Sequence, residues 1–263
     1  MRKLPRLLAI GFALALRRTL TFRVNLLFDV VLAVVALLST LATIMIIFAR
    51  TERLAGWTRS EVIVLIGTFE LVSGIKATFV DPNLTFLSTR AIREGRLDHH
   101  LLQPAPSLFL ATLGTAAPLA GIQILLSLGV VAVGVHATAR PVTIGAVTTW
   151  AVLVGAAAAV TWAIGTLLAS LAFWAPRLDL QSLFGNAWQL GRYPADIYAR
   201  PLRLVLTHAV PLALVATIPA GTLTRRAGAE AAAVTAGATG AVLVLLAAIA
   251  WRRGLRRYSG AGG

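Results

Sequence analysis

The chain has 263 residues, of which 58% are hydrophobic and 13% are charged, and its formal net charge is +14. Several uncharged runs of about twenty residues exclude a soluble globular domain and predict an all-α, polytopic membrane protein. The arginines flank these apolar runs, so we expect them to contact membrane lipids and not nucleic acid. Without cysteine, a disulfide framework and a thiolate metal site are both excluded.

The N-terminal residues 1–23 are predicted to form an interfacial helix. The apolar run from Leu7 to Leu16 is too short to cross about 30 Å of hydrocarbon, and basic residues flank it at both ends. Arg17 and Arg18 follow this run without a polar spacer, which argues against a cleaved signal peptide. We therefore expect the helix to lie along the inner membrane face and to lead the chain into the first span.

Six membrane-spanning helices are predicted within a single transmembrane domain, residues 1–263. The second is the weakest in hydropathy, and it is expected to stop at Asp81-Pro82. The fourth lies in an uncharged run from Pro141 to Pro176, which would be about 54 Å long as a helix and must therefore tilt, kink or project into water. The predicted spans are residues 24–49, 61–80, 108–135, 143–175, either 180–194 or 204–221, and 231–251.

Two arrangements fit the fifth span. In the first, residues 204–221 cross the membrane and the stretch from Arg177 to Arg203 is a cytoplasmic loop. In the second, residues 180–194 cross, and the proline-rich piece from Pro194 to Gly221 enters the outer leaflet and returns, which requires a cover of protein or water. Both arrangements leave more Arg and Lys on the side of the two termini, so both place the termini in the cytoplasm.

A polar segment, AIREGRLDHHLLQPAP from Ala91, separates the second and third spans. Leu97 and Leu101 stand at i, i+4 spacing, and the prolines at its end stop a helix, so a short amphipathic cytoplasmic helix is predicted. The segment is either an ordinary charged loop or a docking element for a soluble partner, with Arg93, Arg96 and Asp98 facing outward. Its two adjacent histidines lack the spacing of metal ligands.

Ionisable residues inside the predicted spans are the next candidates, because each costs roughly 2.5 to 3.5 kcal/mol at a helix centre. Glu70 lies near the middle of the second span, with Ser73 and Gly74 on neighbouring turns. These three residues are candidates for a substrate path, and a structural hydrogen bond to another helix is the alternative role of Glu70. Asp29 and Lys76 are expected near the cytoplasmic ends of their spans, where they could form a salt bridge.

The motifs of several enzyme classes are missing. The two lysines, Lys3 and Lys76, do not follow a glycine, so the chain lacks the GK[ST] of a phosphate-binding loop and is not expected to bind ATP by that route. No GxSxG motif supports an intramembrane hydrolase. An intramembrane lipid- or peptide-processing enzyme, with Glu70, Asp98 or His208 as acid or base, and a non-transporting membrane scaffold remain the alternatives to a transporter.

The whole chain resembles the membrane subunits of bacterial ATP-binding cassette exporters, in the six-span ABC-2 branch of the type-2 permeases. Two stretches carry this resemblance. AIREGRLDHHLLQPAPSLF, from Ala91, is similar to the branch signature I-R-x-G-x-L-D-x-x-L-L-x-P. GRYPADIYARPLRLVLTHAVPLALVATIPAGTL, from Gly191, is similar to the YP-x-x-I-Y…P…P region of the branch.

The resemblance implies specific roles for both stretches. The first would be the coupling helix, which rests on a separate nucleotide-binding ATPase subunit through Arg93, Glu94, Gly95, Arg96, Leu97, Asp98 and Leu101. The second would be a re-entrant outer-leaflet helical segment before the last span, marked by Tyr193, Pro194, Tyr198, Pro211 and Pro219.

The resemblance also implies a division of labour between subunits. The chain itself would be no enzyme and would bind no cofactor, because ATP and Mg belong to the partner ATPase. A second permease subunit, in a heterodimer in preference to a homodimer, would complete an export path through the bacterial cytoplasmic membrane.

Overall fold

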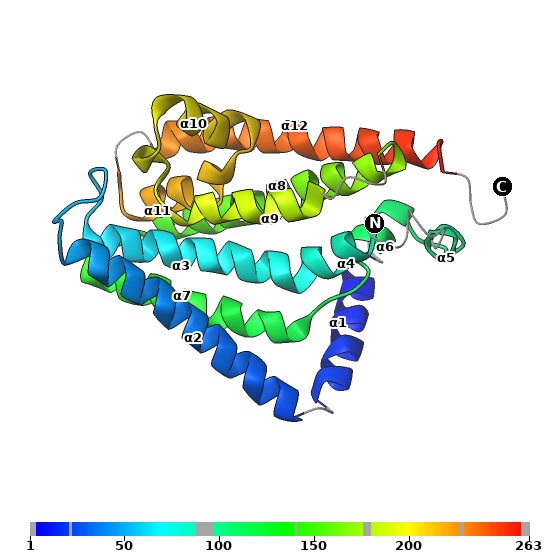
Figure 1. Ribbon diagram of the computed structural model, residues 1–263, viewed down its shortest axis with the longest axis horizontal. Coiled ribbons are helices and arrows are strands. Elements are labelled where there is room, and N and C mark those ends of the chain that lie inside the picture. Colours follow the sequence, from blue (N-terminus) through cyan, green and yellow to red (C-terminus); the bar gives the residue numbers. More distant parts are fainter. Residues whose placement is uncertain are drawn as a thin grey trace.

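The computed structural model describes residues 4–20, 23–87, 97–139, 141–175, 180–226 and 229–258. Within these ranges the chain forms helices that lie side by side, and no β-strand occurs (Figure 1). Five helices are long and apolar enough to cross a membrane, and a helix pair that bends by 73° is a sixth candidate. The all-α prediction is therefore confirmed, with five to six candidate spans in the described part of the chain.

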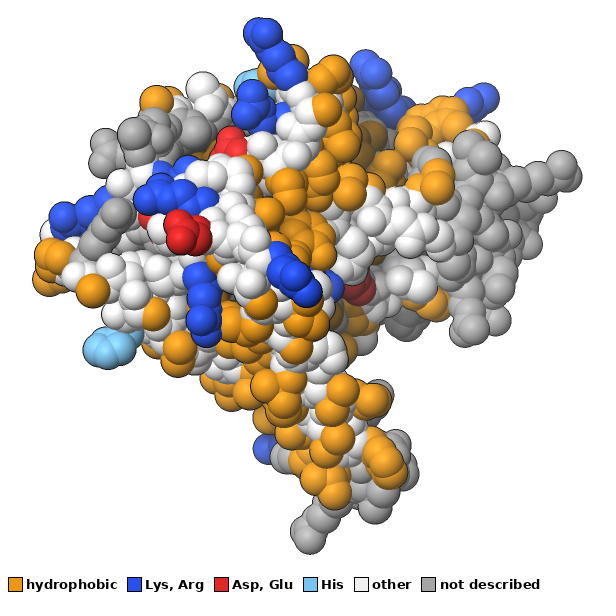
Figure 2. Space-filling view, turned by 60° about the vertical axis from the view of Figure 1, so that its left-hand side comes forward, with side chains coloured by type: hydrophobic (Ala, Val, Ile, Leu, Met, Phe, Trp, Pro, Cys, Tyr) orange, Lys and Arg blue, Asp and Glu red, His pale blue; other side chains and the backbone are white. Residues whose placement is uncertain are grey.

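The first two helices form a corner that projects from the bundle (Figure 1). α1 (Leu4–Leu20) starts at the bundle and runs to this corner, and its Phe12 stacks on Phe79 with ring centroids 6.0 Å apart. α2 (Arg23–Phe48) contains the candidate span Leu26–Phe48, and only 11% of its most apolar stretch is buried. Figure 2 shows hydrophobic side chains along this projecting part. Such a surface is compatible with lipid and not with water.

The third helix continues further than its sequence suggests. α3 (Arg59–Ile75) starts with a capping box, in which Thr58 and Glu61 each bind the other's backbone N–H. The π-helical turn η1 (Lys76–Val80) then leads directly into α4 (Asp81–Phe86), which ends beyond the predicted limit at residue 80. Pro82 does not stop the helix, because it lies in the first turn of α4, where its missing N–H removes no α-helical hydrogen bond.

The predicted third span, residues 108–135, is divided in the structure into α6 (Ser107–Leu113), the 3₁₀ turn η3 (Pro118–Ala120) and α7 (Gly121–Ala137). The Asn83 side chain replaces helical hydrogen bonds at the break. Its Nδ2 donates to the Thr115 carbonyl at 2.7 Å, and its Oδ1 accepts from the Thr115 N–H at 2.8 Å. Pro118 cannot donate a backbone hydrogen bond, so the continuous helix is lost and the candidate span begins at Pro118.

The centre of the bundle is the contact between α3 and α7, which is the most extensive between any two helices of the described chain. A Cβ at Gly67 would lie 2.8 Å from the Val131 backbone N, and a Cβ at Gly134 would lie 2.8 Å from the Val64 backbone N. The two backbones are therefore in direct contact, as small residues permit between membrane helices. Buried residues of α3, including Phe69, extend this core towards the following helices.

The remaining helices complete the bundle around this pair. α8 (Ile144–Ser170), extended by η4 (Leu171–Phe173), packs along α12 (Ala229–Leu255). The short helix α5 (Asp98–Leu101) precedes α6 in the chain. Between η4 and α12 the described chain forms a series of short helices: α9 (Leu180–Trp188), η5 (Gln189–Arg192), η6 (Ala195–Ile197), α10 (Arg200–Leu204), η7 (Val205–Ala209), η8 (Leu212–Leu214) and α11 (Thr217–Leu223).

The bundle has two distinct ends (Figure 1). We call the end that carries the loop of residues 49–58, together with α10 and α11, the loop end. The opposite end carries α4, α5, the start of α1 and the last turn of α12, and we call it the terminal end. The segment that the sequence assigned to the cytoplasm thus lies at the same end as the chain termini.

Candidate functional site

Glu70 is a buried carboxylate in the middle of α3, with 7% of its surface exposed. Its Oε2 accepts a hydrogen bond from Gln123 Nε2 of α7 at 2.8 Å. Its Oε1 lies 3.5 Å from Arg192 Nη2, at the end of η5. The carboxylate therefore joins three elements that are distant in sequence. The hydrogen bond to another helix that was considered for Glu70 is present, and the ion pair with Arg192 is an addition to it.

The Glu70 carboxylate also lines a cavity of about 90 Å³ between α2, α3 and α7. Gln123 and Ser127 of α7 provide the other polar groups of its wall, and α2 contributes only apolar side chains. A partly open space of this size with several polar groups can hold water or a small polar group. Of the three residues predicted to mark a substrate path, Glu70 is the one that lines this cavity.

Ser73 and Gly74 lie at helix contacts. Ser73 Oγ accepts a hydrogen bond from Trp188 Nε1 of α9 at 2.9 Å. A Cβ at Gly74 would lie 3.1 Å from the Ile124 backbone N, so this glycine permits the close approach of α7. The structure places both residues next to Glu70 along the helix, with their contacts directed to α9 and α7.

Lys76 forms a short ion pair with Asp81, with Nζ 2.7 Å from Oδ1, and also lies over the Trp188 ring at 5.3 Å from its centroid. The predicted partner Asp29 is instead exposed on α2. The π-helical turn explains the difference, because it places residues five apart in sequence above one another. The cation is therefore neutralised within its own helical segment.

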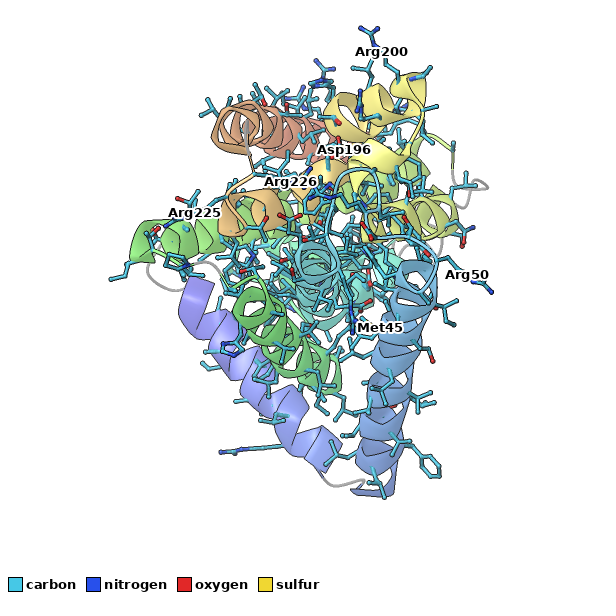
Figure 3. The ribbon with its side chains drawn as sticks, turned by 90° about the vertical axis from the view of Figure 1, so that its left-hand side faces the viewer. Met45, Arg50, Asp196, Arg200, Arg225 and Arg226 are labelled. Carbon is cyan, nitrogen blue, oxygen red and sulfur yellow. The ribbon has the colours of Figure 1, made fainter. Side chains whose placement is uncertain are left out.

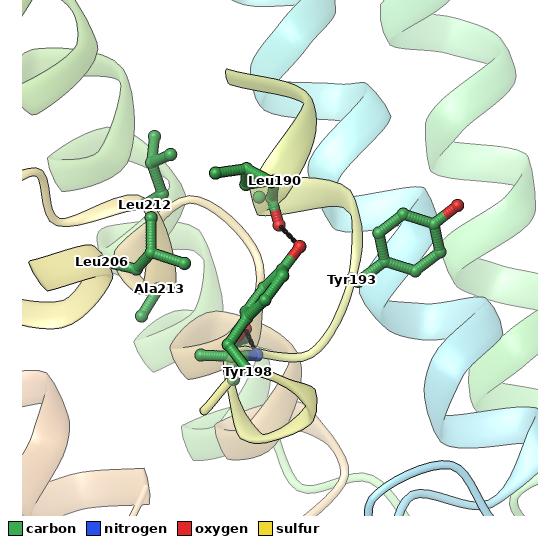
Figure 4. A pocket seen from close by; sticks show the side chains of 9 residues that line it. Leu190, Tyr193, Tyr198, Leu206, Leu212 and Ala213 are labelled. Carbon is green, nitrogen blue, oxygen red and sulfur yellow. Dashed lines mark hydrogen bonds between the residues drawn. The ribbon is translucent and has the colours of Figure 1, made fainter. Parts of the chain in front are cut away.

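The proline-rich segment folds at the loop end. Tyr198 OH donates to the Leu190 carbonyl at 2.8 Å, and the Ala195 N–H donates to Thr217 Oγ1 at 3.1 Å (Figure 4). These bonds connect the start of the segment both to η5 and to α11. The segment bends by 73° between residues 200–208 and 212–223, at the position of Pro211.

The other marker residues lie along the same segment. Pro194 and Pro211 are buried, and Tyr193 is half-buried in extended backbone after η5. Pro219 is buried within the first turn of α11, where proline is tolerated. The prolines thus stand at the starts or breaks of short helices, which explains why this segment forms no single long helix.

A charged cluster at the loop end was not predicted from the sequence. It consists of Trp57, Glu61, Asp196 and Arg226. Arg226 Nη1 lies 3.2 Å from Glu61 Oε2, and its guanidinium stacks over the Trp57 ring at 4.1 Å. Trp57 Nε1 donates in turn to Asp196 Oδ2 at 3.1 Å. Figure 3 shows Arg226 and Asp196 directed towards the middle of this end, whereas Arg50, Arg200 and Arg225 point outward.

The predicted coupling segment is described only in part, because Arg93, Glu94, Gly95 and Arg96 lie outside the described residues. Leu97 is fully buried, in a cluster with Trp251 of α12, and its N–H donates to Tyr258 OH at 3.2 Å. α5 begins at Asp98 and ends at Leu101. Burial raises the pKa of the Tyr258 phenol above 10.0, and the Asp98 carboxylate acts in the same direction, so the phenol is neutral at physiological pH.

The two leucines that follow in α5 and directly after it, Leu101 and Leu102, do not share the burial of Leu97. Leu101 is 40% exposed and Leu102 is 86% exposed. The structure shows a divided face, with Leu97 packed inward and the other two leucines open at the surface of the terminal end.

No group of three or more His, Asp or Glu side chains that could hold a metal ion occurs among the residues that the structure describes. That this chain binds no cofactor, with ATP and Mg on a partner, stays a prediction.

Comparison with protein families gives one decisive result. The model of the ABC-2 family transporter protein matches residues 34–262, which is most of the chain. The chain belongs to the ABC-2 transporter family. Comparison with curated proteins and with solved structures gave no match.

Membership of the ABC-2 family indicates that the long apolar helices lie in a membrane. The candidate spans together with the family identify a multi-pass membrane protein, the membrane component of a transporter and not an enzyme. The family also implies a partnership with an ATP-binding subunit. The matched region includes the loop-end cluster, the terminal-end segment and every residue that lines the Glu70 cavity except Ala33.

Some residues of this ABC-2 transporter site escaped sequence reasoning. Gln123 and Arg192 are 53 and 122 positions from Glu70, and neither belongs to a recognisable motif. For the loop-end cluster a weak signal existed, because the pair Arg225-Arg226 interrupts two apolar stretches and Trp57 lies in a short polar loop. Their mutual contact depends on the fold and is not visible in either stretch alone.

Proposed function

We propose that the chain is the membrane-spanning permease subunit of an ATP-binding cassette exporter. A separate ATPase subunit binds its terminal end, and ATP-driven closure of the ATPase moves the coupling segment. This rigid-body motion switches a path through the membrane from inward-open to outward-open. The absence of a phosphate-binding loop in this chain agrees with ATP binding by another subunit.

The divided leucine face of residues 97–102 is the observation that best supports the docking of a partner. Leu97 fixes the segment to the membrane domain, while Leu101 and Leu102 remain exposed beside the charged Asp98. An apolar centre with a polar rim is the usual composition of a protein interface. Leu97 packs against the membrane domain, while the neighbouring leucines are exposed to a partner. The segment can therefore transmit a displacement from the ATPase to α12 through the contacts of Leu97 with Trp251 and Tyr258.

Co-purification with the ATPase tests this proposal. Reversal of two charges, Arg93→Glu with Asp98→Arg, and separately the replacement Leu102→Glu, should abolish co-purification and the ATP hydrolysis that the complex supports. Arg50→Glu is the matched control, since Arg50 is exposed at the loop end. If the charge-reversed and Leu102 variants hydrolyse ATP in the complex as the wild type does, the coupling role is wrong.

We further propose that two permease subunits enclose the path, as a heterodimer in preference to a homodimer, and that both chain termini face the bacterial cytoplasm. The excess of Arg and Lys on the side of the termini supports this orientation. The projecting α2, with most of its apolar surface uncovered, leaves room for a second membrane subunit or lipid on that side.

The proline-rich segment is proposed to be re-entrant in the outer leaflet. Both of its ends contact the loop of residues 49–58: Asp196 binds Trp57, and Arg226 donates to the Gly56 carbonyl at 3.1 Å. A segment that begins and ends at one end of the bundle has no need to cross. α9 with η5 would then be the fifth crossing, although α9 itself has only 9 residues.

A further inference from the structure

The cavity beside Glu70 has two chemically different walls. α2 supplies Ala33, Ala36 and Leu37, which share one helix face because they stand at i, i+3 and i+4. The opposite wall, from α3 and α7, is polar and contains Glu70 and Gln123. A guest with one apolar side and one hydrogen-bond donor would match both walls at once.

The Glu70 carboxylate is only half satisfied in this environment. Its Oε2 accepts the hydrogen bond from Gln123, but Oε1 is buried and accepts no hydrogen bond from any residue that the structure describes. Buried carboxylate oxygens are almost always hydrogen-bonded, because an unmade bond is costly away from water. The carboxylate of this cavity-lining residue therefore keeps the capacity to accept one further hydrogen bond from a donor outside the chain.

Arg192 balances the charge of Glu70 but donates no hydrogen bond to its Oε1. The two groups are 3.5 Å apart, beyond a tight charge-assisted hydrogen bond, and Arg192 Nε also lacks a hydrogen-bond partner among the described residues. The guanidinium lies over the Phe69 ring at 5.6 Å, and the arginine side chain is 31% exposed. Arg192 can thus leave Glu70 at a modest cost, since its charge has access to water.

We propose that this cavity binds the protonated amine of an amphipathic molecule. The ammonium donates to the Glu70 carboxylate and competes with Arg192, and the apolar part of the molecule lies along Ala33, Ala36 and Leu37 of α2. The site deepens the proposed exporter function, on which it rests, by naming amine-bearing amphiphiles as the substrate class. Binding would also break the contact between Arg192 and Glu70 and so free η5 from α3. In this way an occupied cavity would affect the position of η5 and of the proline-rich segment that follows it.

Binding of a fluorescent primary amine, dansylcadaverine, to the full-length protein in phosphatidylcholine nanodiscs tests the site. Glu70→Gln keeps the size of the side chain but removes its charge, and should weaken binding by roughly tenfold or more. Arg192→Gln removes the competitor and should tighten binding. Asp81→Asn, which removes a carboxylate from the same helical segment outside the cavity, should leave binding unchanged.

Two further measurements separate a site from non-specific adsorption to the membrane. The N-acetylated probe, which carries no ammonium, should show no difference between the wild type and Glu70→Gln. Ala36→Leu fills the cavity from the apolar wall without a change of charge, and should weaken binding even if Glu70→Gln fails to fold. Equal binding by the wild type and either variant, or weaker binding by Arg192→Gln, would overturn the proposal.

The result is distinguishable from a failure of the exporter function. The binding assay contains no ATPase, so amine binding without co-purification of an ATPase would contradict the exporter and leave the cavity site standing. Co-purification with coupled ATP hydrolysis, together with unchanged probe binding in the variants, would contradict the cavity site alone.

Discussion

At the scale of single residues, Arg226 has the most unusual surroundings at the loop end. Its guanidinium contacts a carboxylate, a carbonyl and an aromatic ring, which belong to residues 56–61. Glu61 is itself 6% exposed and also caps α3. A single arginine therefore holds the loop of residues 49–58, the start of α3 and the chain after α11 together.

Arg226→Gln should lower the free energy of unfolding by about 2 kcal/mol, because it removes the guanidinium charge that lies 3.2 Å from the buried Glu61 carboxylate. The measurement is an SDS titration of the purified protein in detergent. Arg225→Gln is the matched control, since the neighbouring side chain is exposed and points outward (Figure 3). Equal stability of the two variants would show that the Arg226–Glu61 pair contributes little.

At the scale of elements, the break between α6 and α7 shows how one polar side chain can shape a membrane helix. Asn83 binds both the N–H and the carbonyl of Thr115, and the Ala117 N–H donates to the Thr78 carbonyl at 2.8 Å. Thr115 and Ala117, which lie outside the helices, therefore take backbone hydrogen bonds from α4 and η1. Such backbone is tolerated near a membrane only where protein satisfies it.

Asn83→Ala should destabilise the fold by roughly 1 to 2 kcal/mol, because two part-buried hydrogen bonds to the Thr115 backbone are lost. Asn83→Asp should destabilise the fold at least as much, because it sets a buried carboxylate against the Phe79 and Thr115 carbonyls that the Asn83 amide now binds. Hydrogen exchange of residues 114–117 checks the local cause, with faster exchange in Asn83→Ala. Unchanged exchange there would contradict the bracing role of Asn83.

The same break marks the limit of what the sequence could predict. Hydropathy identified the long apolar helices, because their length and composition are properties of each segment alone. Residues 108–135 read as one span, because Gly114, Ala116 and Ala117 are as apolar as a helix requires, and the partner Asn83 lies 32 positions away from Thr115. Likewise, Glu70 was found by its charge, but its partner Arg192 could be found only by the fold.

At the scale of the whole molecule, the sequence predicted the family, and the fold shows at which end of the bundle each predicted segment lies. The charged segment and the last turn of α12 meet through Leu97 and Tyr258 at the terminal end, and the proline-rich segment meets the loop of residues 49–58 at the opposite end. The proposed orientation puts the first of these ends in the cytoplasm.

Cysteine labelling tests this orientation, with no background because the wild-type chain contains no cysteine. In intact cells, a membrane-impermeant thiol reagent should label Glu52→Cys, and should label Arg256→Cys only after the membrane is permeabilised. Tyr198→Cys and Arg203→Cys should follow Glu52→Cys if the proline-rich segment is re-entrant from outside. Cytoplasmic labelling of both would contradict the re-entrant arrangement and favour a crossing by residues 204–221.

The direct backbone contact between α3 and α7 has a consequence for sequence variation. No side chain fits at Gly134 while the Val64 backbone lies 2.8 Å from the position of a Cβ, and the same holds for Gly67 and Val131. A relative of this protein that carries a larger residue at either glycine must separate the two helices, and must then refill the space with larger neighbours. We therefore expect positions 67 and 134 to change in evolution only together with the residues that face them.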